Sequence, residues 1–200
     1  MSNSELKRKA KAQLGGKLFS NAWLMALLVC VIVGAITAGA GTVVPGLGYL
    51  LVAGAIEYGT SRVFLDQARS GKAMELGELF SGFSSDFGEL FLLGFLSTLF
   101  AALWALLFVI PGIVKAYSWS LIYYIKLDHP EYNWRECMKE SAAMMRGYKM
   151  KLFLLDLSFI GWYIVGSMCL GVGTLWVIPY HMATHAQFYV ERCKNPFVVE

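Results

Sequence analysis

Charged residues are scarce in this chain of 200 residues, where Asp, Glu, Lys and Arg together make up 16%. A soluble domain usually carries about a quarter charged residues. Hydrophobic residues reach 57%, and the mean hydropathy is +0.55. A chain this short cannot bury so much apolar surface within itself, because its surface is large relative to its volume. We therefore expect lipid to cover part of it, which excludes a soluble enzyme, a disordered chain and a disulfide-stapled secreted module.

Paired cysteines and catalytic motifs are also missing. Cys30, Cys137, Cys169 and Cys193 stand far apart, and no C-x-x-C pair occurs. This spacing indicates neither a zinc framework nor a redox dithiol. The sequence has no Walker loop, no Gly-x-Ser-x-Gly elbow and no paired carboxylates on a soluble face. We therefore expect free thiols, no enzymatic activity, no cofactor and no metal centre.

What the chain has instead is three long apolar runs. They extend over Ala22 to Val44, Leu90 to Ile110 and Leu152 to Ile178. About 20 apolar residues in a helix cross the hydrocarbon layer, which is about 30 Å thick. A proline follows each run directly, at positions 45, 111 and 179. Since proline disfavours helix in the residue before it and suits the first turn of a new helix, we predict a break and a restart at each proline.

Shorter and more polar stretches follow the prolines, at 46–65, 112–127 and 180–190. We interpret them as return crossings, the last of which suits the interior of a bundle. All but one of the 17 Lys and Arg residues lie away from the proline turns, Lys115 being the exception. By the positive-inside rule, the turns then face outward. This predicts six crossings, both termini in the cytoplasm, and no nucleic-acid partner for the net charge of +3.

A cleavable signal peptide is the alternative for the N-terminal segment. A basic start precedes an apolar run there, with Ala38-Gly39-Ala40 near its end. The run from Ala22 is longer than the apolar core of about 7 to 15 residues that signal peptides have. The length therefore favours a retained crossing helix.

An amphipathic stretch precedes each apolar run, with its apolar residues at helical spacing. The apolar faces contain Leu6, Ala10, Leu14 and Leu18 in the first stretch, Leu76, Leu79, Phe80, Phe83 and Phe87 in the second, and Trp134, Met138, Ser141, Met145 and Tyr148 in the third. Asn133 with Glu136 forms a capping-box pattern before the third. We predict helices in the cytoplasmic interface, the first attracted to anionic lipid by its lysines. For the second and third, packing as a soluble-face linker against the bundle is the alternative.

The same order of segments occurs three times, and the prolines are 66 and 68 residues apart. A repeat of this kind predicts one structural unit used three times. We expect a single membrane domain over residues 1–200, with pseudo-repeats of approximately 1–70, 71–132 and 133–200. The predicted fold is an all-α polytopic membrane bundle of three hairpins. Small residues four apart, Ala35 with Gly39 and Ser167 with Gly171, favour close helix packing within it or a homodimer seam.

Several local motifs are specific enough to compare with known families. They are Leu103-Trp104, Ile110-Pro111-Gly112-Ile113-Val114-Lys115-Ala116-Tyr117-Ser118, Ser141, Met144-Met145-Arg146-Gly147, Leu157-Ser158-Phe159-Ile160-Gly161-Trp162, Pro179-Tyr180, Thr184, Ala186 and Phe188-Tyr189. Together they resemble the DUF975 family of bacterial integral membrane proteins. Arg146 stands where the family pattern has lysine, which keeps the positive charge. The resemblance implies a polytopic protein of the bacterial cytoplasmic membrane, and it supplies no activity or site residues.

Five ionisable residues fall within the predicted crossings: Glu57, Lys115, Asp156, His181 and His185. Ionisable groups are costly in a bilayer and are therefore candidate functional residues. Lys115 suits snorkelling to the outer surface or contact with an anion, and Asp156 suits a hydrogen bond near the inner interface. Glu57, the deepest, is compatible with proton coupling.

His181 and His185 are four residues apart and therefore share one helix face. A metal would need further ligands, which the neighbouring sequence does not provide. A structural role, a polar seam and a proton path remain the alternatives for this pair.

These residues support two classes of function. The first is transport or handling of a small solute or lipid, with Glu57, Lys115 and His181 lining a polar path. The second is a noncatalytic accessory, immunity or scaffold protein of the membrane. The expected partners are membrane lipid, a small-molecule or lipid substrate, and either a second copy of the chain or another membrane protein.

Overall fold

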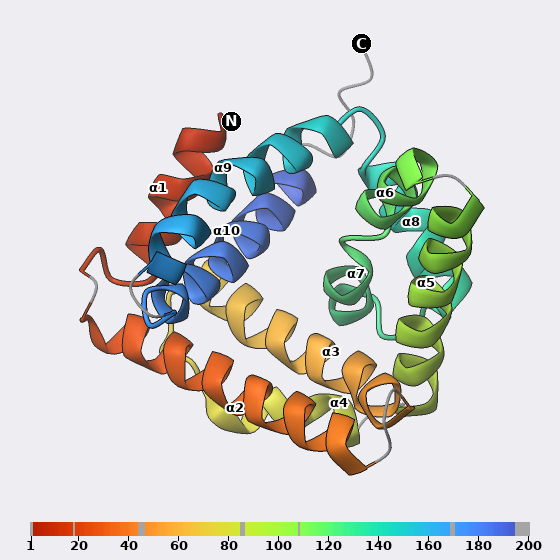
Figure 1. The fold of residues 1–200 in the computed structure, drawn as a ribbon, viewed down its shortest axis with the longest axis horizontal. Coiled ribbons are helices and arrows are strands. Elements are labelled where there is room, and N and C mark those ends of the chain that lie inside the picture. The colour runs from red at the N-terminus through yellow and green to blue at the C-terminus, as the bar shows by residue number, and fades with distance from the viewer. Residues whose placement is uncertain are drawn as a thin grey trace.

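The computed structural model describes residues 2–17, 19–43, 47–84, 87–107, 109–168 and 171–194, which form helices and no strand (Figure 1). In chain order the elements are α1 (Asn3–Gln13), α2 (Asn21–Val43), α3 (Leu47–Ser70), the 3-10 helix η1 (Leu76–Phe80), α4 (Ser81–Ser84), α5 (Phe87–Leu107), α6 (Val109–Ser118), α7 (Ile122–Asp128), α8 (Trp134–Met144), α9 (Lys149–Met168) and α10 (Thr174–Lys194). The predicted all-α class is therefore confirmed.

The larger part of each apolar run lies in α2, α5 or α9, and these three helices are long and apolar enough to cross a membrane. They lie around the periphery, with α3, α7 and α10 between them (Figure 1). The structure buries 17% of the apolar segment of α2, 17% of that of α5 and 22% of that of α9. In water the most apolar helices would be the most buried, so this distribution suits lipid.

The third proline does not mark the turn that was predicted for it. α9 ends at Met168, ten residues before Ile178, and Pro179 lies inside α10. The chain reverses before Thr174, where Gly171 adopts a φ of +79°. A Cβ on Gly173 would lie 2.7 Å from the Cα of Gly166, so the two helices meet there without side chains. Glycine, which tolerates a positive φ and close approach, makes this turn instead of proline.

The second return stretch is also different from its prediction. The segment 112–127 is divided into α6 and α7, and residues 119–121 form a turn between them. Pro111 is the third residue of α6, where an amide hydrogen would have no partner within the helix. Ten residues of helix extend only about 15 Å, so α6 alone is too short to cross. The Pro45 turn lies outside the described residues.

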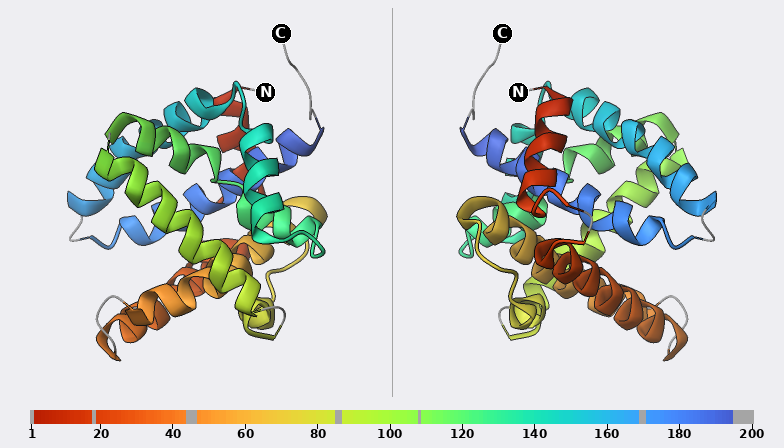
Figure 2. Two further views of the ribbon diagram at one scale, coloured as in Figure 1. Left: turned by 90° about the vertical axis from the view of Figure 1, so that its right-hand side faces the viewer. Right: turned by 90° about the vertical axis from the view of Figure 1, so that its left-hand side faces the viewer.

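α1 packs deeper than an interfacial helix would. Leu6, Ala10 and Leu14 are fully buried, and α1 contacts α10 and α3. Figure 2 shows α1 crossing α10. The Asn3 side-chain amide donates to the backbone carbonyl of Lys151, and the Lys7 ammonium donates to the backbone carbonyl of Ser158. α1 therefore runs beside the first half of α9. The apolar face of α1 is thus covered by protein, because α9 and α10 offer it apolar surface. Leu18, the last residue of the predicted face, lies outside the described residues.

The other two amphipathic stretches form the predicted helical segments. The Asn133 side chain accepts from the amide of Glu136, whose carboxylate accepts from the Asn133 amide, which confirms the capping box. Met138, Ser141 and Met145 are buried. In the second stretch Leu79 is buried, whereas Phe80, Phe83 and Phe87 are exposed, with the rings of Phe83 and Phe87 stacked and that of Phe80 tilted against Phe83. Cys30, Cys137 and Cys193 are free thiols, and Cys169 lies outside the described residues.

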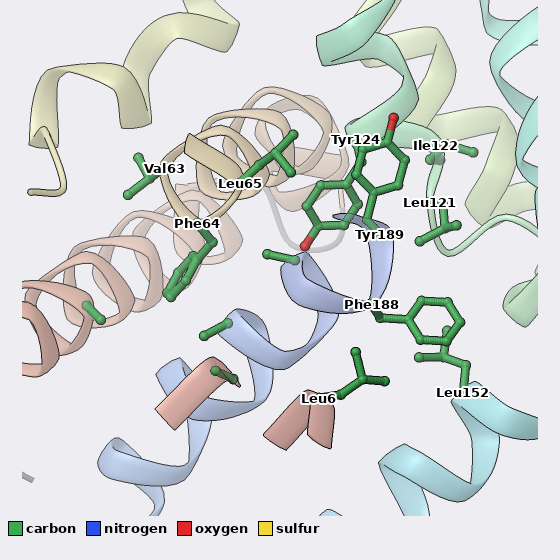
Figure 3. Packing of buried hydrophobic residues seen from close by; sticks show 14 of the residues in the cluster. Leu6, Val63, Phe64, Leu65, Leu121, Ile122, Tyr124, Leu152, Phe188 and Tyr189 are labelled. Atoms are coloured by element: carbon green, nitrogen blue, oxygen red, sulfur yellow. The ribbon is translucent and has the colours of Figure 1, made fainter. Parts of the chain in front are cut away.

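The buried core draws residues from most of the helices, including α1, α2, α3, α7, α8, α9 and α10. Leu6, Leu152 and Phe188 point into it from α1, α9 and α10 (Figure 3). Close approach of helices occurs at Gly54 and Gly59 of α3 and not at the predicted small-residue pairs. A Cβ on Gly54 would lie 2.2 Å from the Leu90 carbonyl oxygen, whereas one on Gly39 would meet nothing within 4 Å.

Candidate functional site

A cavity of about 730 Å³ opens between α3, α5, α6, α7 and α10. This volume is within the range of small-molecule sites. Its hydroxyl groups belong to Thr60, Ser61, Ser97, Thr98, Ser120, Tyr123 and Tyr124, and its acid and imidazoles belong to Glu57, His181 and His185. The remaining walls are largely alanine, glycine and aromatic side chains. The cavity therefore combines an apolar wall with groups that can bind a polar molecule.

One face of α3 builds a wall of this cavity. Ala53, Glu57, Thr60 and Phe64 follow the three- and four-residue spacing of one helix face, and all four line the cavity. Glu57 is surrounded by protein, yet its side chain is accessible because the cavity reaches it. A carboxylate in this position can meet a solute directly.

Asp156 and the two histidines form a compact cluster beside the cavity. His181 Nε2 lies 2.9 Å from Asp156 Oδ1, and His185 Nε2 lies 2.7 Å from the same oxygen. The turn at 171–173 decides how α10 lies along α9. It starts α10 at Thr174 and so brings both histidines to the level of Asp156 on α9. His181 and His185 line the cavity, and Asp156 lies behind them.

Three aromatic residues hold this cluster in place. The Tyr117 hydroxyl donates to Asp156 Oδ2 at 3.0 Å, and the Tyr163 hydroxyl lies 3.3 Å from His181 Nδ1. The Phe159 ring packs against the His181 imidazole, with centroids 4.6 Å apart. Each polar atom of Asp156 therefore has a partner, and the orientations of the carboxylate and of His181 are fixed.

Lys115 lies apart from the other predicted residues. Its ammonium is 5.5 Å from the centroid of the Trp104 ring and 5.7 Å from that of Trp119, and it does not line the cavity. These aromatic faces attract a cation. The structure therefore brings Glu57, His181 and His185 to one cavity and Asp156 to its edge, and it leaves Lys115 outside the predicted path.

Sequence reasoning named Asp156 as a candidate but did not place it beside the histidines. Asp156 comes from another helix, so the residues near His181 in the sequence could not reveal this contact. Tyr117 and Tyr163 gave no signal beyond their aromatic character. The hydroxyls of Thr60 and Ser61 were detectable, because they continue the face of α3 that carries Glu57.

A family model described as "Protein of unknown function (DUF975)" matches residues 1–122 and 108–194. The chain belongs to the DUF975 family. The resemblance based on the run from Ile110 to Ser118 is thus confirmed. No curated protein matches this DUF975 protein, and no solved structure matches it. The family is of unknown function, and the cavity is the feature of this chain that bears on one.

Proposed function

We propose that this DUF975 protein is a multi-pass protein of the bacterial cytoplasmic membrane that binds a small polar solute in its cavity and moves it. The observation that carries the proposal is the cavity of about 730 Å³, in which Glu57 faces a hydroxyl-rich lining. Such a lining inside a chain with outward-facing apolar helices offers a solute the hydrogen bonds that lipid lacks. A polar solute suits these groups better than a lipid tail does.

The proposed topology has α2, α5 and α9 as outward crossings. Each contacts the element that follows it, namely α3, α6 and α10. These elements, together with α7, return the chain, which gives three pseudo-repeated hairpins with both termini in the cytoplasm. The interruption between α6 and α7 borders the cavity at Trp119 and Ser120. Interrupted helices at a central site are typical of transporters.

The proposal concerns binding and movement instead of catalysis. Ser97 and Ser120 line the cavity, but their hydroxyls donate to the backbone carbonyls of Gly94 and Tyr117. A serine nucleophile would instead need a base within hydrogen-bond reach. The cavity hydroxyls therefore suit solute recognition.

A solute screen on the purified protein tests this function. Thermal shift and native mass spectrometry would be measured against sugars, polyols, amines, amino acids and carboxylates. We expect a ligand whose binding is lost in Ala101→Phe, which fills the cavity, and weakened in Glu57→Gln. Ala35→Phe, on the exposed surface of α2, is the matched control and should bind normally. Equal binding by all three variants would contradict a role for the cavity.

A different observation favours the second candidate, a noncatalytic accessory, immunity or scaffold protein. Both oxygens of the Asp156 carboxylate already have hydrogen-bond partners. A carboxylate with three hydrogen-bond donors suits a structural role. In that case another membrane protein or a second copy of the chain would co-purify. Its binding would survive Glu57→Gln and Ala101→Phe unchanged, which distinguishes this class from solute transport.

A further inference from the structure

The cluster beside the cavity has the donor set of a metal site. One possible ligand atom from each of Asp156, His181 and His185 lies within 4.8 Å of the other two, and both Nε2 atoms contact Asp156 Oδ1. Two imidazoles and one carboxylate suit zinc and its neighbours in the first transition series, whereas calcium and magnesium prefer oxygen ligands. Sequence reasoning expected no metal because it found no third ligand, and α9 supplies one.

We propose that Asp156, His181 and His185 bind one divalent transition-metal cation of the zinc, cobalt or nickel class. This inference goes beyond the proposed function, since a metal bound here does not depend on a solute in the cavity. Bonds of about 2.0–2.2 Å at tetrahedral angles hold ligand atoms about 3.4 Å apart. The present separations of 2.7 and 2.9 Å need to widen by about 0.5 to 0.7 Å to admit the cation.

Second partners orient two of the three ligands. Tyr117 holds Asp156 Oδ2, which leaves Oδ1 to ligate, and Tyr163 holds His181 Nδ1, which leaves Nε2. Outer-shell partners of this kind fix the ring and its tautomer in metalloproteins. In the bound state each imidazole carries its hydrogen on Nδ1, and the Tyr163 hydroxyl accepts that of His181.

The cavity gives the cation both a route and an open coordination position. His181 and His185 line the cavity, and their side chains remain 26% and 23% exposed. Three protein ligands leave a fourth position for water or for a donor atom of a bound molecule. The geometry thus points to an accessible site instead of a closed structural one.

Zinc titration of the purified full chain, stripped with chelator and followed by calorimetry, tests the site. We expect one Zn²⁺ per chain, no saturable binding in Asp156→Asn or in the double variant His181→Gln/His185→Gln, and affinity about 10- to 100-fold weaker in Tyr163→Phe. His129→Gln removes the third histidine, which stacks on Tyr132 and contacts Glu131, and should bind as the parent does. Stoichiometric binding that survives in the double variant would overturn the proposal.

A second measurement needs no variant, so it tests the site even if the substituted chains fail to fold. X-ray absorption at the zinc edge of the unmodified protein should show imidazole nitrogen in the coordination shell, and Co²⁺ should give visible ligand-field absorption. If the unmodified chain takes up no stoichiometric metal, or its bound zinc has no imidazole ligand, the cluster is a hydrogen-bonded triad only and the proposal is wrong.

Discussion

Lys126 shows how a single charged residue is accommodated inside this fold. Its side chain is 6% exposed, and its ammonium donates to Glu89 Oε2 at 2.9 Å and to the carbonyls of Pro130 and Tyr132 at 2.8 and 2.7 Å. Three acceptors match its three hydrogens, which removes most of the cost of burying the charge. The contacts connect α7, the start of α5 and the segment that leads to α8.

Lys126→Met is expected to lower the free energy of unfolding by about 2 kcal/mol, because two carbonyls lose their donor. Unfolding in detergent, followed by circular dichroism, measures the change. Lys139→Met, at an exposed position of α8, is the control and should change stability little. A Lys126 variant as stable as this control would show that the contacts contribute nothing.

Asp128 gives a prediction about pH. The Arg69 guanidinium donates two hydrogen bonds to its carboxylate, at 2.5 and 2.6 Å, and the Tyr189 hydroxyl donates a third at 2.7 Å. Burial raises the pKa of Asp128, but these hydrogen bonds outweigh it and leave the pKa below its usual value of 3.8. The carboxylate therefore stabilises the fold above pH 3.8, and this contribution is lost as the pH falls through the lowered pKa.

Asp128→Asn should cost roughly 1 kcal/mol near neutral pH, a modest value because the pair is partly exposed. The difference from the parent should shrink as the pH is lowered below about 4. Unfolding measured over a pH series checks this. A difference that stays constant across the series would mean that the charge of Asp128 is not what stabilises the pair.

At the scale of elements, α3 is packed so closely that glycine is required. A Cβ on Gly59 would lie 1.9 Å from the carbonyl oxygen of Leu79, in η1. Gly59→Ala should therefore destabilise the protein by about 2 kcal/mol or more, since backbone atoms must move apart. Gly161→Ala in α9, where a Cβ meets nothing within 4 Å, should instead stabilise slightly by helix propensity. If Gly59→Ala and Gly161→Ala changed the unfolding free energy in the same direction, the close packing at Gly59 would be contradicted.

The helices that depend on a pattern within their own residues could be predicted from the sequence. The apolar runs of α2, α5 and α9 were predictable from composition, and the start of α8 from the pair Asn133 and Glu136. The turn before α10 was not, because Gly171 and the contact of Gly166 with Gly173 decide it, and Pro179 is tolerated within the helix. That shift of the turn hid the site, since it determines which residues of α10 face Asp156.

At the scale of the whole molecule, the proposed topology fixes the side of each loop. With the four cysteines replaced by serine, a single cysteine at Val172 should react with an impermeant maleimide added outside intact cells. One at Glu131, in the turn before α8, should react only after the cells are opened. Both positions are exposed in the structure, so access depends on the membrane alone. Labelling of both from the same side would contradict a crossing by α9.

If the protein spans the membrane as proposed, lipid covers the exposed apolar residues of α2, α5 and α9, and spin labelling measures this directly. Nitroxide labels at Val31, Leu99 and Ile164 would be compared with one at Lys139 of α8, in protein reconstituted into bilayers. We expect the three labels to collide with oxygen and to be shielded from a water-soluble nickel complex, whereas the label at Lys139 should show the reverse. Nickel access to Val31, Leu99 and Ile164 equal to that at Lys139 would place these helices in water and would rule out the proposed membrane crossings.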